Sequence, residues 1–135
     1  MKEMTLEAKI ENIPRVTAFI DEQLEALDCS MKAQMQIDVA IDELFGNISH
    51  YAYVPGTGEA TVGFDFDEET RTVSVIFSDR GVPFDPLVRI DPDISAPAQE
   101  RAIGGLGIFL VKKTMDSLEY RYEDGKNVLT IKKKI

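Results

Sequence analysis

Four segments of this sequence alternate between apolar and polar residues, and they come as two adjacent pairs. In the first pair, 60–66 and 73–77, the alternation is interrupted only by a short acidic turn. In the second pair, 118–122 and 129–131 flank Asp124-Gly125, a dipeptide typical of hairpin turns. Strands that follow each other across such short turns run antiparallel, so these segments predict a sheet built largely from hairpins.

The first half of the chain adds one strand and two helices. Residues 3–10 alternate and predict a strand, and Asn12 is placed to cap a helix whose apolar residues lie within 16–27. A longer helix follows, for which Asp28 or Ser30 is the expected cap. Its predicted apolar stripe consists of Met35, Ile37, Ala40, Ile41, Leu44, Phe45 and Ile48.

The order of elements is therefore strand, helix, helix, strand, strand, long loop, helix, strand, strand. Because repeated strand–helix–strand units are absent, a doubly wound parallel sheet is not expected. We predict an α+β fold, a two-layer sandwich in which a mixed, mostly antiparallel sheet carries helices on one face. A length of 135 residues, 44% of them hydrophobic, suits a single domain over 1–135 with its own core.

Composition argues against several functional classes. The formal net charge of −9 disfavours binding to a phosphate backbone, so no direct nucleic acid partner is expected. No apolar run approaches the roughly 20 residues of a membrane span, and the N-terminus lacks a secretory segment, so we expect a cytoplasmic protein without membrane contact. The single cysteine, Cys29, rules out an internal disulfide, and the single histidine, His50, rules out a histidine-rich metal site.

Glu43 and Asn47 are four residues apart in the second helix and share one of its faces. An asparagine oxygen is a suitable ligand for Mg²⁺, which often completes its coordination with water and phosphate oxygens. A carboxylate one turn earlier could accept a proton from an attacking hydroxyl or water. The alternative, a solvated polar face, stays open for this pair alone.

Asp79-Arg80-Gly81 follows a predicted strand. A carboxylate at a strand end can accept a hydrogen bond from an exocyclic amine such as that of adenine, and Gly81 would let the backbone approach a flat ring. The segment continues to Phe84 as a rigid apolar wall. An ordinary turn is the alternative interpretation, because Asp and Gly are common turn residues.

Gly104-Gly105-Leu106-Gly107 opens the third helix, where backbone N–H groups can bind anionic oxygens. Arg101 stands just ahead and could reach a terminal phosphate. The preceding irregular stretch, 79–103, contains four prolines and could act as a lid. A flexible loop followed by a helix start remains the alternative.

In this order, Glu43-Leu-Phe-Gly-Asn47, Asp79-Arg-Gly81 and Gly104-Gly-Leu-Gly107 resemble the adenine-nucleotide motifs of the GHKL superfamily, which includes gyrase, the histidine kinases and a heat-shock chaperone. The small size and the segment Met115-Asp116-Ser-Leu resemble its stand-alone branch, the anti-sigma-factor serine/threonine kinases. The resemblance covers nearly the whole chain.

The resemblance implies that Glu43 is the catalytic base, that Asn47 binds Mg²⁺ and that Asp79 recognises adenine. The implied nucleotide site comprises Asn47, Asp79, Gly81, Phe84, Arg101, Gly104, Gly105, Leu106 and Gly107. Lys126-Asn127 stands where the family often has a threonine near the adenine, so neither Asn127 nor Thr130 is assigned a nucleotide role.

The implied reaction transfers the γ-phosphate of ATP, with Mg²⁺, to a serine of a small anti-anti-sigma protein. The implied second role is to bind and silence a sigma factor, and proteins of this kind are typically homodimers. Two alternatives remain at this point: a non-catalytic nucleotide-binding module that acts by binding protein partners, and an ATP-hydrolysing unit without a protein substrate.

Overall fold

The computed structural model describes residues 1–53, 55–88 and 105–135, and only the backbone of 88, 105 and 106. Its strands are β1 (Lys2–Glu7), β2 (Glu59–Asp67), β3 (Thr72–Asp79), β4 (Ser117–Glu123) and β5 (Lys126–Lys134). Its α-helices are α1 (Ile13–Ala26), α2 (Met31–Tyr51) and α3 (Gly105–Thr114), and two single turns of 3₁₀-helix span Ile10–Asn12 and Pro86–Val88.

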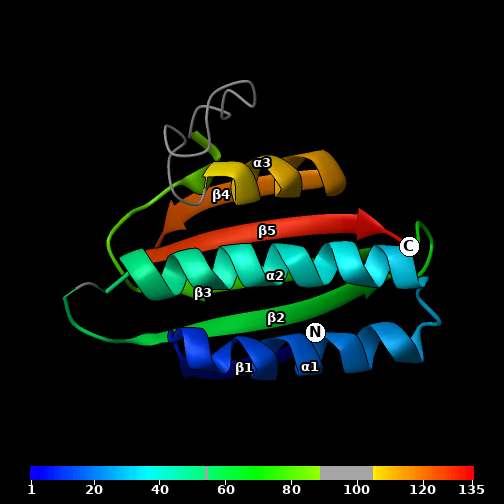
Figure 1. The fold of residues 1–135 in the computed structure, drawn as a ribbon, viewed down its shortest axis with the longest axis horizontal. Coiled ribbons are helices and arrows are strands. Elements are labelled where there is room, and N and C mark those ends of the chain that lie inside the picture. Colours follow the sequence, from blue (N-terminus) through cyan, green and yellow to red (C-terminus); the bar gives the residue numbers. More distant parts are fainter. Residues whose placement is uncertain (54, 89–104) are drawn as a thin grey trace.

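The five strands form one sheet in the order β1-β2-β3-β5-β4. All three α-helices lie on the same face of the sheet, with α2 between α1 and α3 (Figure 1). The predicted α+β fold with helices on one face is confirmed. Among the described strands every pairing is antiparallel, so the parallel pair that a mixed sheet would contain is not found there.

The core lies between the sheet and the helices. Helix α2 contributes Ile37, Ile41 and Phe45, all fully buried, and the sheet contributes Val62 and Phe77. Each such side chain stabilises the fold by roughly 1.5–3 kcal/mol relative to leaving it in water. The prediction that Met35 belongs to this buried stripe is wrong, because 61% of its surface is exposed on the outer side of α2.

The two predicted helix caps have different outcomes. The Ser30 hydroxyl accepts a hydrogen bond from the N–H of Ala33 at 3.2 Å, which confirms Ser30 as the cap of α2. Asn12 precedes α1 but does not cap it with its side chain. The 3₁₀ turn already holds the Asn12 backbone near helical angles (φ −92°, ψ −5°), whereas a capping residue is normally extended.

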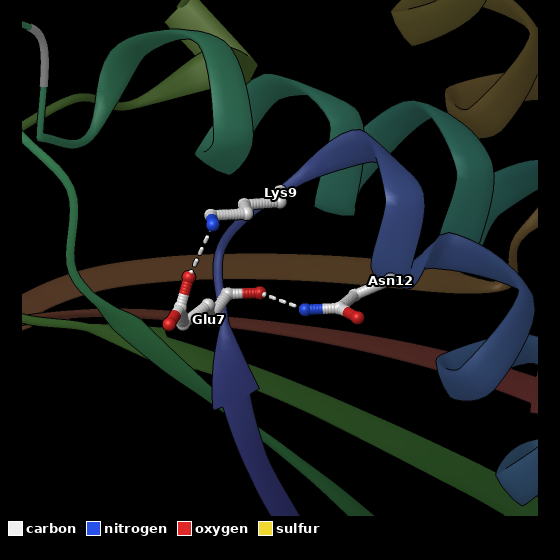
Figure 2. A network of polar contacts seen from close by, with 3 residues as sticks. All are labelled: Glu7, Lys9 and Asn12. Carbon is white, nitrogen blue, oxygen red and sulfur yellow. Dashed lines mark hydrogen bonds and ion pairs between the residues drawn. The ribbon is translucent and has the colours of Figure 1, made fainter.

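The side chain of Asn12 instead ties α1 to the end of β1. Its Nδ2 donates to the carbonyl of Glu7 at 2.8 Å, and the Lys9 ammonium pairs with the Glu7 carboxylate at 2.6 Å (Figure 2). The ion pair is exposed to solvent and therefore contributes little to stability. The network fixes the corner at which the chain leaves the sheet.

Three elements converge at one end of the sheet, and this convergence positions the site. Asp79 at the end of β3 is the register partner of Asn127 near the start of β5. Just beyond β3, the N–H of Val82 donates to the carbonyl of Ala52, the C-cap of α2, at 2.9 Å. None of the helices in the described ranges is both long and apolar enough to cross a membrane.

Candidate nucleotide-binding site

A pocket lies between α2, the ends of β3 and β5, and the segment that follows β3. Its lining is mainly apolar and consists of Leu44, Asn47, Ile48, Tyr51, Ala52, Phe77, Asp79, Val82, Phe84, Pro86, Tyr120, Asn127 and Leu129. Asn47, Asp79 and Asn127 are the only buried polar or charged side chains in the described part of the chain, and all three line this pocket. An apolar hollow with a few convergent polar groups is typical of small-molecule sites.

Asp79 is held in place by two hydrogen bonds to the same carboxylate oxygen. Its Oδ1 accepts from the N–H of Gly81 at 2.8 Å and from Nδ2 of Asn127 at 3.0 Å. Asp79 is only 6% exposed, so the pocket is where its carboxylate can meet a bound molecule. Asp79 therefore lines the pocket with its carboxylate fixed, and its recognition of adenine remains a prediction.

Gly81 is required by a close approach between two backbones. A Cβ at this position would lie 2.5 Å from the carbonyl carbon of Ala52 and 2.6 Å from its Cβ, closer than real atoms pack. The glycine therefore lets the segment after β3 pack directly on the C-terminal end of α2. Its predicted approach to a ligand ring is a separate role, which remains a prediction.

Phe84 forms part of the pocket wall. Its ring stacks on that of Tyr51, with centroids 5.3 Å apart and an interplanar angle of 27°. Its backbone N–H donates to Oδ1 of Asn127 at 3.0 Å. A side chain on α2 and a strand residue thus hold the Phe84 segment from two sides.

A second hollow adjoins the first along α2, and Asn47 lines both. The second hollow is formed by Ile10, Ile13, Asp42, Glu43, Gly46, Asn47, His50 and Tyr51. Asn47 is 9% exposed, so the alternative of a solvated polar face is wrong for this residue. Asn47 therefore lies between the first pocket and Glu43, and its role as a metal ligand remains a prediction.

The side-chain amide of Asn47 also fits a ligand. Its Nδ2 is buried and has no hydrogen-bond partner among the described residues. A buried polar atom without a partner is costly, so a residue of this kind calls for an explanation. A half-turn of the amide exchanges its nitrogen and oxygen, and would present the oxygen that Mg²⁺ prefers. Groups of three or more His, Cys, Asp or Glu suited to a metal do not occur within the described ranges.

The third motif lies directly beside the first. Gly107, in the first turn of α3, is so close to Glu43 that a Cβ on it would lie 2.5 Å from Oε1 of Glu43 and nearer still to Oε2. Gly105 and Leu106 belong to the same turn, of which the structure describes the backbone. Arg101 and Gly104 lie outside the described residues. The structure thus brings Glu43 to the start of the helix that is predicted to bind phosphates.

Asn127 and Tyr120 are pocket residues that the sequence motifs do not reveal. Asn127 follows a hairpin turn and lies where the related family often has a threonine, and because its residue type departs from that pattern the sequence assigns it no role. Tyr120 is one of several alternating apolar residues in β4. The register between β3 and β5 is the signal that could identify Asn127, because it pairs that residue directly with Asp79. Thr130, also left without a role, does not line the pocket.

Comparison with known proteins identifies the family to which this chain belongs. The model of the histidine kinase-like ATPase domain family matches residues 6–133. This chain therefore belongs to the histidine kinase-like ATPase family.

Several relatives have been named as protein kinases. Serine/threonine-protein kinase BtrW of Bordetella bronchiseptica is 28% identical over 102 residues, which cover 76% of this chain and 71% of that protein. Serine-protein kinase RsbW of Bacillus mycoides is 27% identical over 134 residues, or 96% and 82% of the two chains. RsbW of Bacillus cereus (strain ATCC 10987) is 35% identical over 98 residues, which cover 70% of this chain and 60% of that protein.

Proposed function

We propose that this protein is an ATP-dependent serine/threonine protein kinase of the anti-sigma regulatory type. One observation carries the proposal: the three buried polar side chains of the described residues line a single pocket, and one of them, Asn47, also borders the hollow that contains Glu43. The family to which the chain belongs and the kinase names of its relatives support the same function.

At the ring end of the site, the Asp79 carboxylate accepts a hydrogen bond from the exocyclic amine of adenine. Gly81 and Phe84 border the ring. At the phosphate end, backbone N–H groups at the start of α3 bind the anionic oxygens, aided by the helix dipole. Arg101, Gly104, Gly105, Leu106 and Gly107 are the residues that we assign to this end.

Asn47 is the protein ligand of the metal ion. A bound Mg²⁺ would neutralise part of the charge on the triphosphate oxygens. The contribution of the chain itself is to fix the Asn47 amide within the wall of α2, between the ring and the reacting end.

Glu43 is the general base. As the hydroxyl oxygen of a substrate serine bonds to the γ-phosphorus, Glu43 takes up the hydroxyl proton. The bond between the γ-phosphorus and the oxygen that bridges it to the β-phosphate breaks, and ADP leaves with that oxygen. Proton transfer to a positioned side chain of this kind is worth roughly 10²–10⁴-fold in rate.

The protein substrate that we propose is a small anti-anti-sigma protein, and a sigma factor is the second partner, held and thereby silenced. We also propose that the kinase acts as a homodimer. The acidic surface of the chain, with its formal charge of −9, suits protein partners better than nucleic acid.

The decisive experiment is phosphotransfer to a candidate anti-anti-sigma protein with Mg-ATP, followed by mass spectrometry of the phosphoserine. Glu43→Gln should lower transfer by at least about 100-fold while ATP is still bound. Glu22→Gln, an exposed change on α1, is the matched control. Transfer that survives Glu43→Gln would rule out the base role, and ATP binding without any transfer would instead identify a non-catalytic binding module.

A further inference from the structure

Asn127 uses its whole side-chain amide to hold the segment that follows β3. Nδ2 donates to Oδ1 of Asp79 at 3.0 Å and to the carbonyl of Val82 at 2.9 Å, with a longer contact to the carbonyl of Gly81 at 3.4 Å. Oδ1 accepts from the N–H of Phe84 at 3.0 Å and from the hydroxyl of Tyr120. A buried amide with this many partners is a fixed junction, because each lost bond would leave a desolvated group unpaired.

Phe84 and Tyr120 together keep this junction in one orientation. Burial raises the pKa of the Tyr120 hydroxyl above its usual value, so the hydroxyl stays protonated and donates to Asn127. The backbone N–H of Phe84 can only donate, so it requires the amide oxygen of Asn127 to lie on this side, and the Tyr120 hydroxyl adds a second donor to the same oxygen. The amide nitrogen is then directed at Asp79 and the carbonyls beyond it.

The consequence for Asp79 is that one carboxylate oxygen is already engaged. Both hydrogen bonds that its side chain accepts from described residues, from Gly81 and Asn127, go to Oδ1. Oδ2 is the oxygen that remains for a molecule in the pocket. Since the carboxylate cannot rotate without losing two bonds, the pocket presents an acceptor at one fixed point.

We propose that Asn127, oriented by the N–H of Phe84 and by the Tyr120 hydroxyl, is a positioning residue that makes the pocket selective for 6-aminopurine over 6-oxopurine nucleotides. The amine of adenine offers a donor to the fixed acceptor, whereas the oxygen of a 6-oxopurine offers a second acceptor and leaves both unpaired. In a 6-oxopurine the nearest donor is the N–H at ring position 1. A carboxylate that was free to rotate could move to accept a hydrogen bond from this N–H instead. Asn127 prevents that rotation. This inference rests on the proposal that the ring lies beside Asp79.

The test compares the dissociation constants of ATP and inosine triphosphate, measured by titration calorimetry with Mg²⁺. Asn127→Ala should weaken ATP about tenfold, the effect expected for the loss of one or two net hydrogen bonds, and should weaken inosine triphosphate much less. The preference for ATP should therefore fall by at least severalfold. Tyr120→Phe removes only one donor and should lower the preference in the same direction, by a smaller factor.

Tyr122→Phe is the matched control, because Tyr122 lies two residues further along β4, is 48% exposed and does not line this pocket. Equal losses of both nucleotides in Asn127→Ala and Tyr120→Phe, or no loss in either, would overturn the positioning role. If Asn127→Ala does not fold, Tyr120→Phe alone decides the question by the same ratio. ATP affinity that is unchanged in Asp79→Asn would contradict the proposed ring site itself, a result distinct from the failure of Asn127.

Discussion

The carboxylate of Glu43 on α2 lies against the α-carbon of Gly107 on α3, with no space for a side chain between them. The contact joins the proposed base to the first turn of the helix proposed to bind phosphates. Any change in the position of α3 therefore acts on Glu43, and the converse also holds. A side chain at position 107 would force the Glu43 carboxylate or the start of α3 to move.

Gly107→Ala tests this relationship. The added Cβ would overlap the Glu43 carboxylate, so either Glu43 or α3 must shift. A displacement of about 1 Å at a reacting group can cost roughly 100-fold in rate, so phosphotransfer should fall by about that factor. The measurement is the rate of serine phosphorylation under single-turnover conditions.

Leu110→Ala is the control for Gly107→Ala, because Leu110 is exposed on the same helix. It should leave the transfer rate close to that of the original protein. A Gly107→Ala variant with unimpaired transfer would show that the contact with Glu43 has no role in the reaction.

Gly81→Ala should lower both stability and ATP affinity. The new methyl group would collide with the Ala52 backbone and break the hydrogen bond from the N–H of Val82. Forcing extra atoms into a packed contact costs about 1–3 kcal/mol, which urea denaturation can measure. Arg80→Ala, one residue earlier and exposed, keeps the backbone contact and should unfold at the original urea concentration. An unchanged midpoint for Gly81→Ala would disprove the packing argument.

The hairpins and helices could be predicted from the sequence because each depends on local alternation or helical spacing. The buried face of α2 was harder to predict, because helical spacing alone also admits Met35, which the structure exposes. The cap at Asn12 failed because a 3₁₀ turn, invisible to spacing, precedes α1. Both errors concern how an element is oriented against its neighbours, which tertiary contacts decide.

The site shows a similar division. Glu43, Asn47, Asp79 and Gly81 stand out because their residue types suit the chemistry and occur in short motifs. Asn127 does not stand out, since its contact with Asp79 joins residues 48 positions apart and depends on strand register. Long-range pairings of this kind carry no local signal.

Asn47→Leu should separate function from stability. The buried Nδ2 atom has no described partner, so replacing the amide with an apolar group of similar size should stabilise the fold by on the order of 1 kcal/mol. The same change removes the proposed metal ligand and should abolish Mg²⁺-dependent phosphotransfer. Asn47→Asp keeps an oxygen ligand and should retain part of the activity. Loss of stability in Asn47→Leu, with transfer intact, would assign the residue a structural role.

Asp38 should make stability depend on pH. Burial, and then the hydrogen bond and negative charge of Asp21, raise the pKa of Asp38 from 3.8 to about 7 in the folded protein. Between pH 4 and pH 7 the folded state therefore holds a proton that the unfolded state has released. By linkage, the free energy of unfolding decreases as pH rises through this window and levels off above it.

Asp38→Asn should remove this slope. The substitution should therefore raise the free energy of unfolding more at pH 8 than at pH 5. The side chain is only partly buried, so the gain should be on the order of 1 kcal/mol, below the full value of the shift. Urea unfolding at the two pH values measures it. Asp42→Asn, an exposed change on the same helix, should keep the original slope, and an identical slope in Asp38→Asn would refute the assignment.

The site draws Glu43, Asn47 and Tyr51 from one uninterrupted helix, and Ala52 from its C-cap. The distance along the axis from Glu43 to Ala52 is thus fixed by helical rise at roughly 13 Å, and each added residue would turn one end by about 100° relative to the other. Functional relatives should therefore tolerate insertions and deletions in the turn between β2 and β3, yet show none between positions 43 and 52. In any redesign of this protein, the insertion or deletion of a single residue within this part of α2 would displace its site residues relative to one another.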